Sequence, residues 1–220
     1  MDNNFDKFPD VSFGNMVQLI GMKGIEIENG SCIGDNAWLN VCVRDEKVRL
    51  KIGRCVLIGR QSLISTGGYL EIGDYCLLAP RVYISDADHV FEDIYTPIIQ
   101  QGVTLNRSVI VEDNCWIGIN VVITGDIVVG RGSIIAANSV VNKSVPPFSL
   151  VAGNPFKIIK MYNPKNQTWE RVRSEAEIQN VFKDREEVGL PTREEYKKIL
   201  NENSRIRRLD PILAGNGINI

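Results

Sequence analysis

The sequence has little of what builds a metal centre. Its 220 residues include a single histidine, and its five cysteines show no CxxC spacing. A protein zinc site takes about four histidine, cysteine or carboxylate ligands, so we expect no metal. The cysteines are Cys32, Cys42, Cys55, Cys76 and Cys115. We interpret them as small packed thiols that stay reduced, which suits a cytoplasmic location.

The sequence also lacks an excess of basic charge and a long apolar run. Its net charge is −2, whereas nucleic-acid-binding domains typically carry clustered positive charge. No apolar stretch approaches the roughly 18–20 residues of a membrane span. The N-terminal segment MDNNFDKFPD lacks the charged-then-apolar pattern of a secretion signal. We therefore expect a cytoplasmic protein of one main domain, with no nucleic-acid partner and no membrane span.

Aliphatic residues recur with a period of six through the range 111–145. They are Val111, Ile117, Ile123, Val129, Ile135 and Val141. Four positions after each comes a small or branched residue: Cys115, Val121, Ile127, Ser133, Ser139 and Val145. A period of six matches neither a helix of 3.6 residues per turn nor a lone strand of period 2. It is typical of a β-helix, in which short strands and corners repeat and the aliphatic residue points into a narrow interior.

The same frame recurs upstream. The positions are Ile27, Ile33, Leu39, Ile52, Ile58, Ile64, Ile72, Leu78 and Ile84. Together with the downstream set they make fifteen hexads, and because three hexads form one triangular coil, we expect roughly five coils. The stretches 44–51 and 65–71 add extra residues to the frame, and we predict that both are bulges at corners.

Both ends of such a coil need a cap, because a solenoid end exposes apolar interior and open strand edges. Residues 1–24 are apolar without a clear hexad frame, and we interpret them as an irregular cap followed by a first imperfect coil. Pro146 and Pro147 predict that the chain leaves the coil there, and FKIIKMY is predicted as one last strand. We place the β-helix domain at 1–162, with the loop 85–110 inserted, and a C-terminal helical extension and tail at 163–220.

Two helices are expected in the extension. The first has Thr168 as its cap, and its apolar face is Trp169, Val172, Ala176 and Val181. The second begins with a capping box at 192–195. Its buried residues are Tyr196, Ile199 and Leu200. The tail from Ser204 onward is basic and then apolar, and two interpretations stay open: it docks on a neighbouring subunit, or it is frayed.

The largest interruption of the repeat, 85–110, contains the only histidine, His89. Insertions at solenoid corners often carry function, and an imidazole is the side chain that accepts and returns protons near neutral pH. We therefore predict that His89 is a general base. Asp88 or Asp86 would orient the imidazole and stabilise its cationic form. Both aspartates remain candidates: Asp88 is next to His89 in sequence, but adjacent residues on extended backbone point apart, so Asp86 is plausible as well.

Four segments carry a resemblance to a known family. They are ISDADH at 84–89, PIIQQG at 97–102, EDNCWIG at 112–118 and VPPFSLVAGNPFKIIK at 145–160. In combination they resemble the hexapeptide-repeat acyltransferases. Within these, the sequence is most similar to the O-acetyltransferases of surface polysaccharide and lipopolysaccharide synthesis and to the galactoside, maltose and xenobiotic acetyltransferases. The resemblance covers about residues 25–162.

The resemblance implies both a fold and a function. The fold is an all-β solenoid, a left-handed parallel β-helix with a protruding loop. The handedness comes from the resemblance alone, because crossover connections are usually right-handed. The implied activity is acetyl transfer from acetyl-CoA to a hydroxyl of a sugar or polysaccharide precursor, with His89 assisting direct attack on the thioester. The implied assembly is a homotrimer with its sites in the clefts between subunits.

Matching the family pattern position by position assigns a donor side. Trp116 would line the acyl and pantetheine region. Ile119 stands where the family often has serine, so only its backbone N–H would contact the acyl donor, and Ala137 would offer a backbone amide to the pantetheine. The residues expected at the far end of the donor are Asn142, Lys143, Lys157 and Lys160. The family has two arginines at the last two positions, and lysine neutralises phosphate without their bidentate fork.

On the acceptor side, Ser65 and Thr66 lie near the family's acceptor-contacting asparagine. Two other functions stay open: N-acylation of an amino sugar, and a non-catalytic role as a β-helix structural subunit. The hexapeptide-repeat carbonic anhydrases are excluded, because they hold zinc with three histidines and His89 gives a single one per site.

Overall fold

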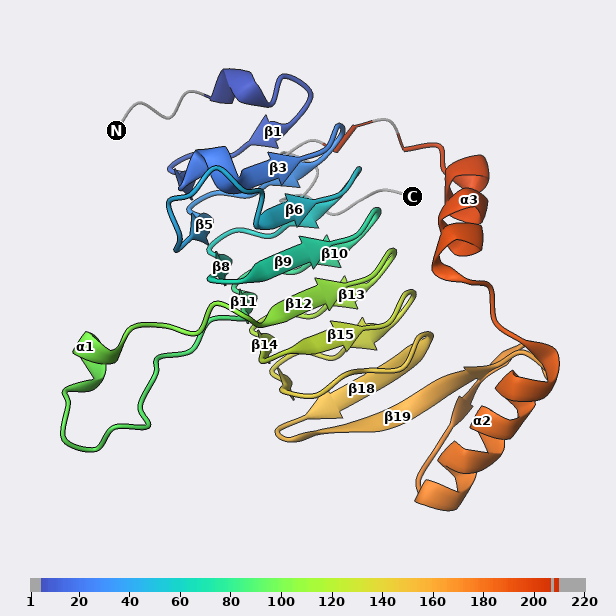
Figure 1. Cartoon of the computed structure of the whole chain (residues 1–220). Coiled ribbons are helices and arrows are strands. Elements are labelled where there is room, and N and C mark those ends of the chain that lie inside the picture. Colours follow the sequence, from blue (N-terminus) through green and yellow to red (C-terminus); the bar gives the residue numbers. More distant parts are fainter. Residues whose placement is uncertain (1–4, 207, 210–220) are drawn as a thin grey trace.

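The body of the protein is a triangular coil of short parallel strands (Figure 1). The structure is a computed structural model that describes residues 5–206, 208 and 209. Side 1 contains β3 (Ile25–Ile27), β6 (Leu50–Ile52), β9 (Tyr69–Ile72), β12 (Ser108–Val111) and β15 (Ile127–Val129). Side 2 contains β1 (Ser12–Phe13), β4 (Cys32–Ile33), β7 (Leu57–Ile58), β10 (Leu77–Leu78), β13 (Trp116–Ile117), β16 (Ile134–Ile135) and β18 (Ser149–Gly153). Side 3 contains β2 (Gln18–Ile20), β5 (Trp38–Val41), β8 (Leu63–Thr66), β11 (Tyr83–Ser85), β14 (Val122–Thr124) and β17 (Val140–Val141).

The interior of the coil is built from the aliphatic residues of the repeat. All fifteen predicted positions are buried, and Ile27 is the most exposed of them at 8%. In-register pairing of neighbouring strands stacks these residues, as with Ile58, Leu78 and Ile117 on side 2. Each buried residue therefore packs against its equivalents one coil above and one coil below. The predicted left-handed parallel β-helix is confirmed.

The positions four residues after the aliphatic ones are also buried, with two exceptions. Val43 is only half-buried and Asp88 is exposed. In both coils the chain leaves the repeat early, and a residue two positions after the aliphatic one turns inward instead: Val41 after Leu39, and Asp86 after Ile84. The hexad frame predicted the strands correctly, but in these two coils it placed the corner that follows Leu39 and Ile84 two residues too far along the chain.

Two of the three corners are tight turns through the left-handed region. The corner from side 1 to side 2 has positive φ at Cys55, Tyr75 and Asn114, among others. The corner from side 2 to side 3 has it at Asn36, Gln61, Arg81, Asn120 and Asn138. The third corner, from side 3 to side 1, differs because it takes the insertions: the 3-10 helix η2 (Met22–Gly24), residues 42–49, Gly67–Gly68 and 86–107. The two predicted corner bulges are confirmed, and both lie here.

The N-terminal end of the coil is capped as predicted. The 3-10 helix η1 (Phe5–Lys7) precedes β1, and the rings of Phe5 and Phe13 stack with centroids 4.1 Å apart. Phe8 is buried in the same cluster. Together these aromatic rings cover the apolar interior at the end of the solenoid.

At the other end, the prediction that the coil stops at Pro146 is wrong. The two prolines lie at a corner, and the chain continues into β18, which pairs in parallel with β16. A proline at a corner removes no ladder hydrogen bond, so the coil tolerates it. The chain then reverses into the predicted last strand, β19 (Phe156–Asn163), and β20 (Thr168–Arg171) pairs antiparallel with it. The expected domain boundary at 162 thus falls within β19.

The helix predicted from Thr168 is also wrong at its start. Thr168 begins β20, because pairing with β19 takes up this segment. Helix α2 (Glu175–Val188) starts later, where the Ser174 hydroxyl accepts from the N–H of Glu177 at 3.3 Å. Val181 packs with Met161 and Val172 in a small second core. No helix in the described part of the chain is long and apolar enough to cross a membrane.

Helix α3 (Arg193–Asn203) begins at the predicted capping box between Thr192 and Glu195. The expected burial of its apolar residues is wrong, because Ile199 is exposed and no residue of α3 is fully buried. Polar groups attach it to the corner between sides 1 and 2. Arg193 pairs with Asp113 at 2.9 Å, and one turn later Lys197 pairs with Asp74 at 3.0 Å. The predicted tail falls mostly outside the described residues, so its docking stays a prediction.

Candidate active site

The loop 86–107 leaves the third corner between β11 and β12 as a stem of two paired limbs (Figure 1). The Thr104 N–H donates to the Asp88 carbonyl at 2.8 Å, and the Val90 N–H donates to the Gly102 carbonyl at 3.1 Å. Between these bonds, His89 and Val103 form an antiparallel bridge. The sequence folds this way because the corner tolerates insertion, and the stem holds the exposed His89 just beyond the coil.

The two candidate partners of His89 have different surroundings. Asp88 is exposed and forms an ion pair with Arg107 on the opposite limb, at 3.0 Å. Asp86 is 1% exposed and accepts four hydrogen bonds from the corner below it. Its donors are the Thr66 hydroxyl at 3.0 Å and the N–H groups of Gly67, Gly68 and Tyr69 at 2.9, 2.8 and 2.8 Å. These bonds tie the Asp86 carboxylate to the corner, and Arg107 engages the Asp88 carboxylate, so which aspartate orients the imidazole stays a prediction.

The two expected acceptor residues also separate. Both are buried, but Thr66 has no exposed surface and is bonded to Asp86, whereas Ser65 keeps 9% of its surface exposed, so the expectation of a substrate contact stays with Ser65. The Asn40 amide donates to the Ser65 hydroxyl at 3.0 Å and to the Cys42 thiol at 3.2 Å. Sequence reasoning missed Asn40 and Cys42. The available signal was the register, because Asn40, Ser65 and Ser85 are direct neighbours on side 3.

The expected acyl and pantetheine residues lie on another part of the coil. Trp116 points outward from β13 on side 2 and is 51% exposed. Ile119 and Ala137 lie at the corner between sides 2 and 3 in successive coils, where the Ile119 carbonyl accepts from the N–H of Asn138 at 2.9 Å. In a triangular coil, side 2 is opposite the corner that carries His89. A single chain therefore does not bring His89 and Trp116 together.

The expected phosphate-binding lysines gather at the C-terminal end of the coil. Lys157 and Lys160 are three residues apart on β19, which on a regular strand would place them on opposite faces. A register shift between β18 and β19 pairs Lys157 with Ala152 and Lys160 with Leu150, so both lysines face outward. Lys143 lies over the Phe156 ring at 5.2 Å, and its exposed neighbour is Asn142.

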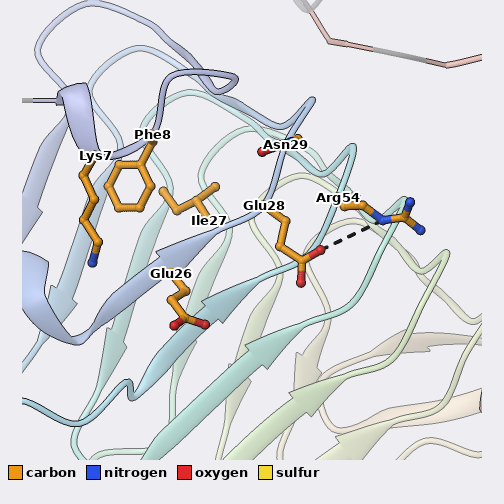
Figure 2. Close-up of a pocket in the computed structure, with 7 residues that line it drawn as sticks. All are labelled: Lys7, Phe8, Glu26, Ile27, Glu28, Asn29 and Arg54. Atoms are coloured by element: carbon orange, nitrogen blue, oxygen red, sulfur yellow. Dashed lines mark ion pairs between the residues drawn. The ribbon is translucent and has the colours of Figure 1, made fainter.

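A separate hollow of about 350 Å³ lies at the other end of the molecule. Figure 2 shows it over the first coils, where Glu28 and Arg54 form an ion pair at 3.9 Å. Its lining residues are Lys7, Phe8, Glu26, Ile27, Glu28, Asn29 and Arg54. None of them is a predicted site residue, and their mixed charges favour no single ligand.

The phenol of Tyr69, near the base of the loop, does not compete with His89 as a base. Tyr69 begins β9, and burial together with the nearby Glu71 carboxylate raises its pKa to about 12. Its hydroxyl donates to Glu71 at 3.0 Å, so the phenol keeps its proton near neutral pH. Among the residues that the structure describes, no three histidine, cysteine or acidic side chains form a group that could hold a metal.

Comparisons with known proteins agree with this architecture. Residues 108–143 match the family model described as bacterial transferase hexapeptide (six repeats). A probable acetyltransferase of Mycobacterium tuberculosis is 31% identical over 67% of this chain and 50% of its own length. The galactoside O-acetyltransferase of Escherichia coli is 30% identical over 61% of this chain and 66% of its own. The chain thus spans about half to two thirds of the length of these relatives.

A solved structure supports the fold. A mutant N-acyltransferase from Bacillus cereus, in complex with dTDP and coenzyme A, superposes with a TM-score of 0.57 at 22% identity. The superposition covers 83% of this chain and 95% of that one. The repeat, the triangular coil and these relatives agree: residues 108–143 carry the bacterial transferase hexapeptide repeat, and the chain is similar to the hexapeptide-repeat transferases.

Proposed function

We propose that this protein transfers an acetyl group from acetyl-CoA to a hydroxyl of a sugar or polysaccharide precursor. His89 acts as the general base, and the active site forms between copies of a homotrimer. The observation that carries the proposal is the stem, which presents an exposed His89 at the same corner of the coil as the polar groups of Ser65 and Asn40. The E. coli relatives, one named a galactoside O-acetyltransferase and one a putative lipopolysaccharide O-acetyl transferase, support a hydroxyl acceptor.

The chemistry follows from the base. His89 takes the proton of the acceptor hydroxyl as its oxygen attacks the thioester carbonyl carbon. The carbon–sulfur bond then breaks, and the imidazolium returns the proton to the thiolate of CoA, so the histidine is regenerated. Asp88 stabilises the transient imidazolium. The backbone N–H of Ile119 is the donor that we assign to the oxygen of the tetrahedral intermediate.

The trimer is supported by apolar residues that are left exposed. The tip of the loop, with helix α1 (Ile98–Gln101), exposes Ile94 by 83%, Tyr95 by 91% and Ile99 by 86%. Outward-facing Leu77 and Trp116 on side 2 and Leu63 and Tyr83 on side 3 are also exposed. Apolar exposure on this scale marks an interaction surface. Two copies side by side would bring His89 of one to the Trp116 side of the other, which one chain cannot do.

The acyl donor is acetyl-CoA, bound along the outside of the C-terminal coils. Trp116 walls the thioester end, and Ala137 meets the pantetheine. Lys143, Lys157 and Lys160 neutralise the phosphates. The outward orientation of Lys157 and Lys160 supports this, because both reach solvent on one face. A cytoplasmic location fits the use of acetyl-CoA.

The test is an assay with acetyl-CoA and a panel of acceptors: methyl β-galactoside, maltose, glucosamine and dTDP-4-amino-4,6-dideoxyglucose. Products are identified by mass, and their linkage shows whether oxygen or nitrogen is acetylated. We expect O-acetylation, a loss of about 10²–10⁴-fold in kcat for His89→Ala, and a trimer mass by sedimentation. Full turnover by His89→Ala would refute the assignment of the base, whereas amine-only products would favour N-acylation. A protein that neither binds acetyl-CoA nor acetylates any acceptor would be a structural subunit.

The donor site has its own test. Lys157→Ala with Lys160→Ala should raise KM for acetyl-CoA several-fold and leave the acceptor KM nearly unchanged. The effect should shrink with added salt, since exposed charges are screened over about 8–10 Å at physiological ionic strength. The matched control is Lys183→Ala, an exposed lysine on α2. A change confined to the acceptor KM would contradict the assignment.

A further inference from the structure

The corner Gly67–Gly68 is held from two directions by side chains of opposite charge. Asp86 accepts from both glycine N–H groups. Arg49 donates to both glycine carbonyls, at 3.4 Å for Gly67 and 3.0 Å for Gly68. Asp45 in turn orients the guanidinium through bonds of 3.1 and 2.7 Å. Both the donors and the acceptors of these two glycines are therefore engaged by charged groups, which form the strongest class of hydrogen bond in proteins.

This corner carries both limbs of the stem that presents His89. A Cβ at Gly67 would lie 2.8 Å from the Thr104 carbonyl oxygen and 3.3 Å from Cβ of Ala87. A Cβ at Gly68 would collide with the carbonyl oxygen of Arg107. Ala87 belongs to the outgoing limb, whereas Thr104 and Arg107 belong to the returning one. Only glycine lets the two limbs approach the corner this closely.

We propose that Asp86 is a positioning residue that acts through His89. Its buried carboxylate fixes the Gly67–Gly68 corner, the corner fixes both limbs of the stem, and the stem fixes where the imidazole lies. The proposal rests on the proposed function, in which His89 is the base. Asp86 itself touches neither substrate nor imidazole.

The physical reason for such a device is the exposure of the stem. His89 is exposed, and the bonds to its neighbours Asp88 and Val90 come from the other limb of the stem and not from the coil. Without a rigid base, a stem of this kind would move relative to the coil. Misplacement of a catalytic group by about 1 Å can lower turnover by about 10²-fold. A carboxylate with four donors and almost no solvent contact gives the base of the stem this rigidity.

The experiment compares Asp86→Asn with Thr66→Val. The Asp86→Asn change keeps the shape of the side chain but turns an amide NH₂ group toward backbone N–H donors. Thr66→Val removes one of the four bonds and serves in case the first variant does not fold. We expect kcat to fall about 10–100-fold for Asp86→Asn, and less for Thr66→Val. The KM for acetyl-CoA should stay within about twofold. The acceptor is the panel member that the wild-type protein acetylates fastest.

Two further measurements separate positioning from a general loss of stability. In a His89→Ala background, Asp86→Asn should lower kcat no further, because it acts only through the imidazole. By hydrogen exchange, peptides covering 87–90 and 102–107 should exchange faster in Asp86→Asn, while the coil stays protected. The control is Asp113→Asn. Asp113 is another buried aspartate and accepts from the Asp74 N–H at 2.8 Å, but it lies at the corner beside α3. The control variant should lose stability and keep kcat.

The outcomes are distinct. If His89→Ala is fully active, the proposed function fails, and the positioning role fails with it. If His89→Ala is inactive but Asp86→Asn keeps full kcat with a protected stem, the positioning role alone fails. The same follows if Asp86→Asn lowers kcat equally with and without His89.

Discussion

The tight corners and the open corner of this coil are built in different ways. At the tight corners, a single residue in the left-handed region turns the chain from one side to the next in coil after coil, for example Asn120 and Asn138 in successive coils. At the open corner the connection differs from coil to coil. It is as short as Gly67–Gly68 in one coil and as long as the stem with His89 in another. Stacked tight corners fix the spacing of the strands, which leaves the third corner free to carry function.

The largest effect should come from lengthening a tight corner. Insertion of Ser-Gly after Asn120 would break the stack with Asn138, whose side-chain oxygen accepts from the Asn120 amide at 2.9 Å. We expect a loss of about 4 kcal/mol or more, equivalent to about 10 °C in Tm for a chain of this size. The same insertion after Gly125, at the open corner, should lower Tm by only a few degrees. If the two insertions lowered Tm equally, the tight corner and the open corner would not differ in their tolerance of added residues.

A smaller effect should come from crowding the open corner. Gly68→Ala places a Cβ against the Arg107 carbonyl, so the corner or the stem must move. We expect a loss of about 2–4 kcal/mol by urea denaturation. Gly102→Ala is the comparison, because a Cβ there meets nothing within 4 Å and only its φ of +90° is unfavourable. This variant should lose about 1 kcal/mol, and a larger loss than for Gly68→Ala would contradict the packing argument.

Acid should separate the coil from the helix that lies along one tight corner. Burial raises the pKa of Asp74, but hydrogen bonds from the Arg54 N–H and from Lys197 outweigh it and leave the pKa below 3.8. Because the folded pKa is depressed, the stabilisation is complete above the unfolded value and is lost as pH falls through the folded one. We therefore expect α3 to detach as the pH falls below about 4, before the apolar coil unfolds.

Pepsin cleavage near residues 189–192 as a function of pH would measure this step. Lys197→Ala should shift cleavage to higher pH, because its removal takes away one of the bonds that lower the pKa of Asp74. Lys198→Ala is the matched control, since Lys198 is exposed and pairs only weakly with Glu202 at 4.0 Å. Cleavage that follows unfolding of the whole coil would show that α3 and the coil are one unit.

The same contrast explains what could be predicted from the sequence. The coil follows from a local rule that places a residue such as Ile117 inside, so its fifteen aliphatic positions were predictable. The start of α2 was not, because Thr168 joins a strand whose partner, β19, is set by tertiary pairing. The contacts of Asp86 were not predictable either. Its partners lie about twenty residues away at a corner that has no repeat, so no sequence spacing relates them.

The smallest effect should come from relieving one tight corner. Gln61 is exposed and has a φ of 59°, a region that disfavours residues with a Cβ by roughly 1–2 kcal/mol. Gln61→Gly should therefore leave stability within about 1 kcal/mol of wild type, with strain relief offset by the greater freedom of glycine in the unfolded chain. Gln61→Val should lower it by about 1–2 kcal/mol, because a β-branched side chain fits this region worst. Urea denaturation of both variants measures the difference. If the Gln61→Val variant were as stable as the Gln61→Gly variant, the left-handed turn would not be what holds the corner. The stacking of the strands alone would then have to explain why this corner admits no insertion.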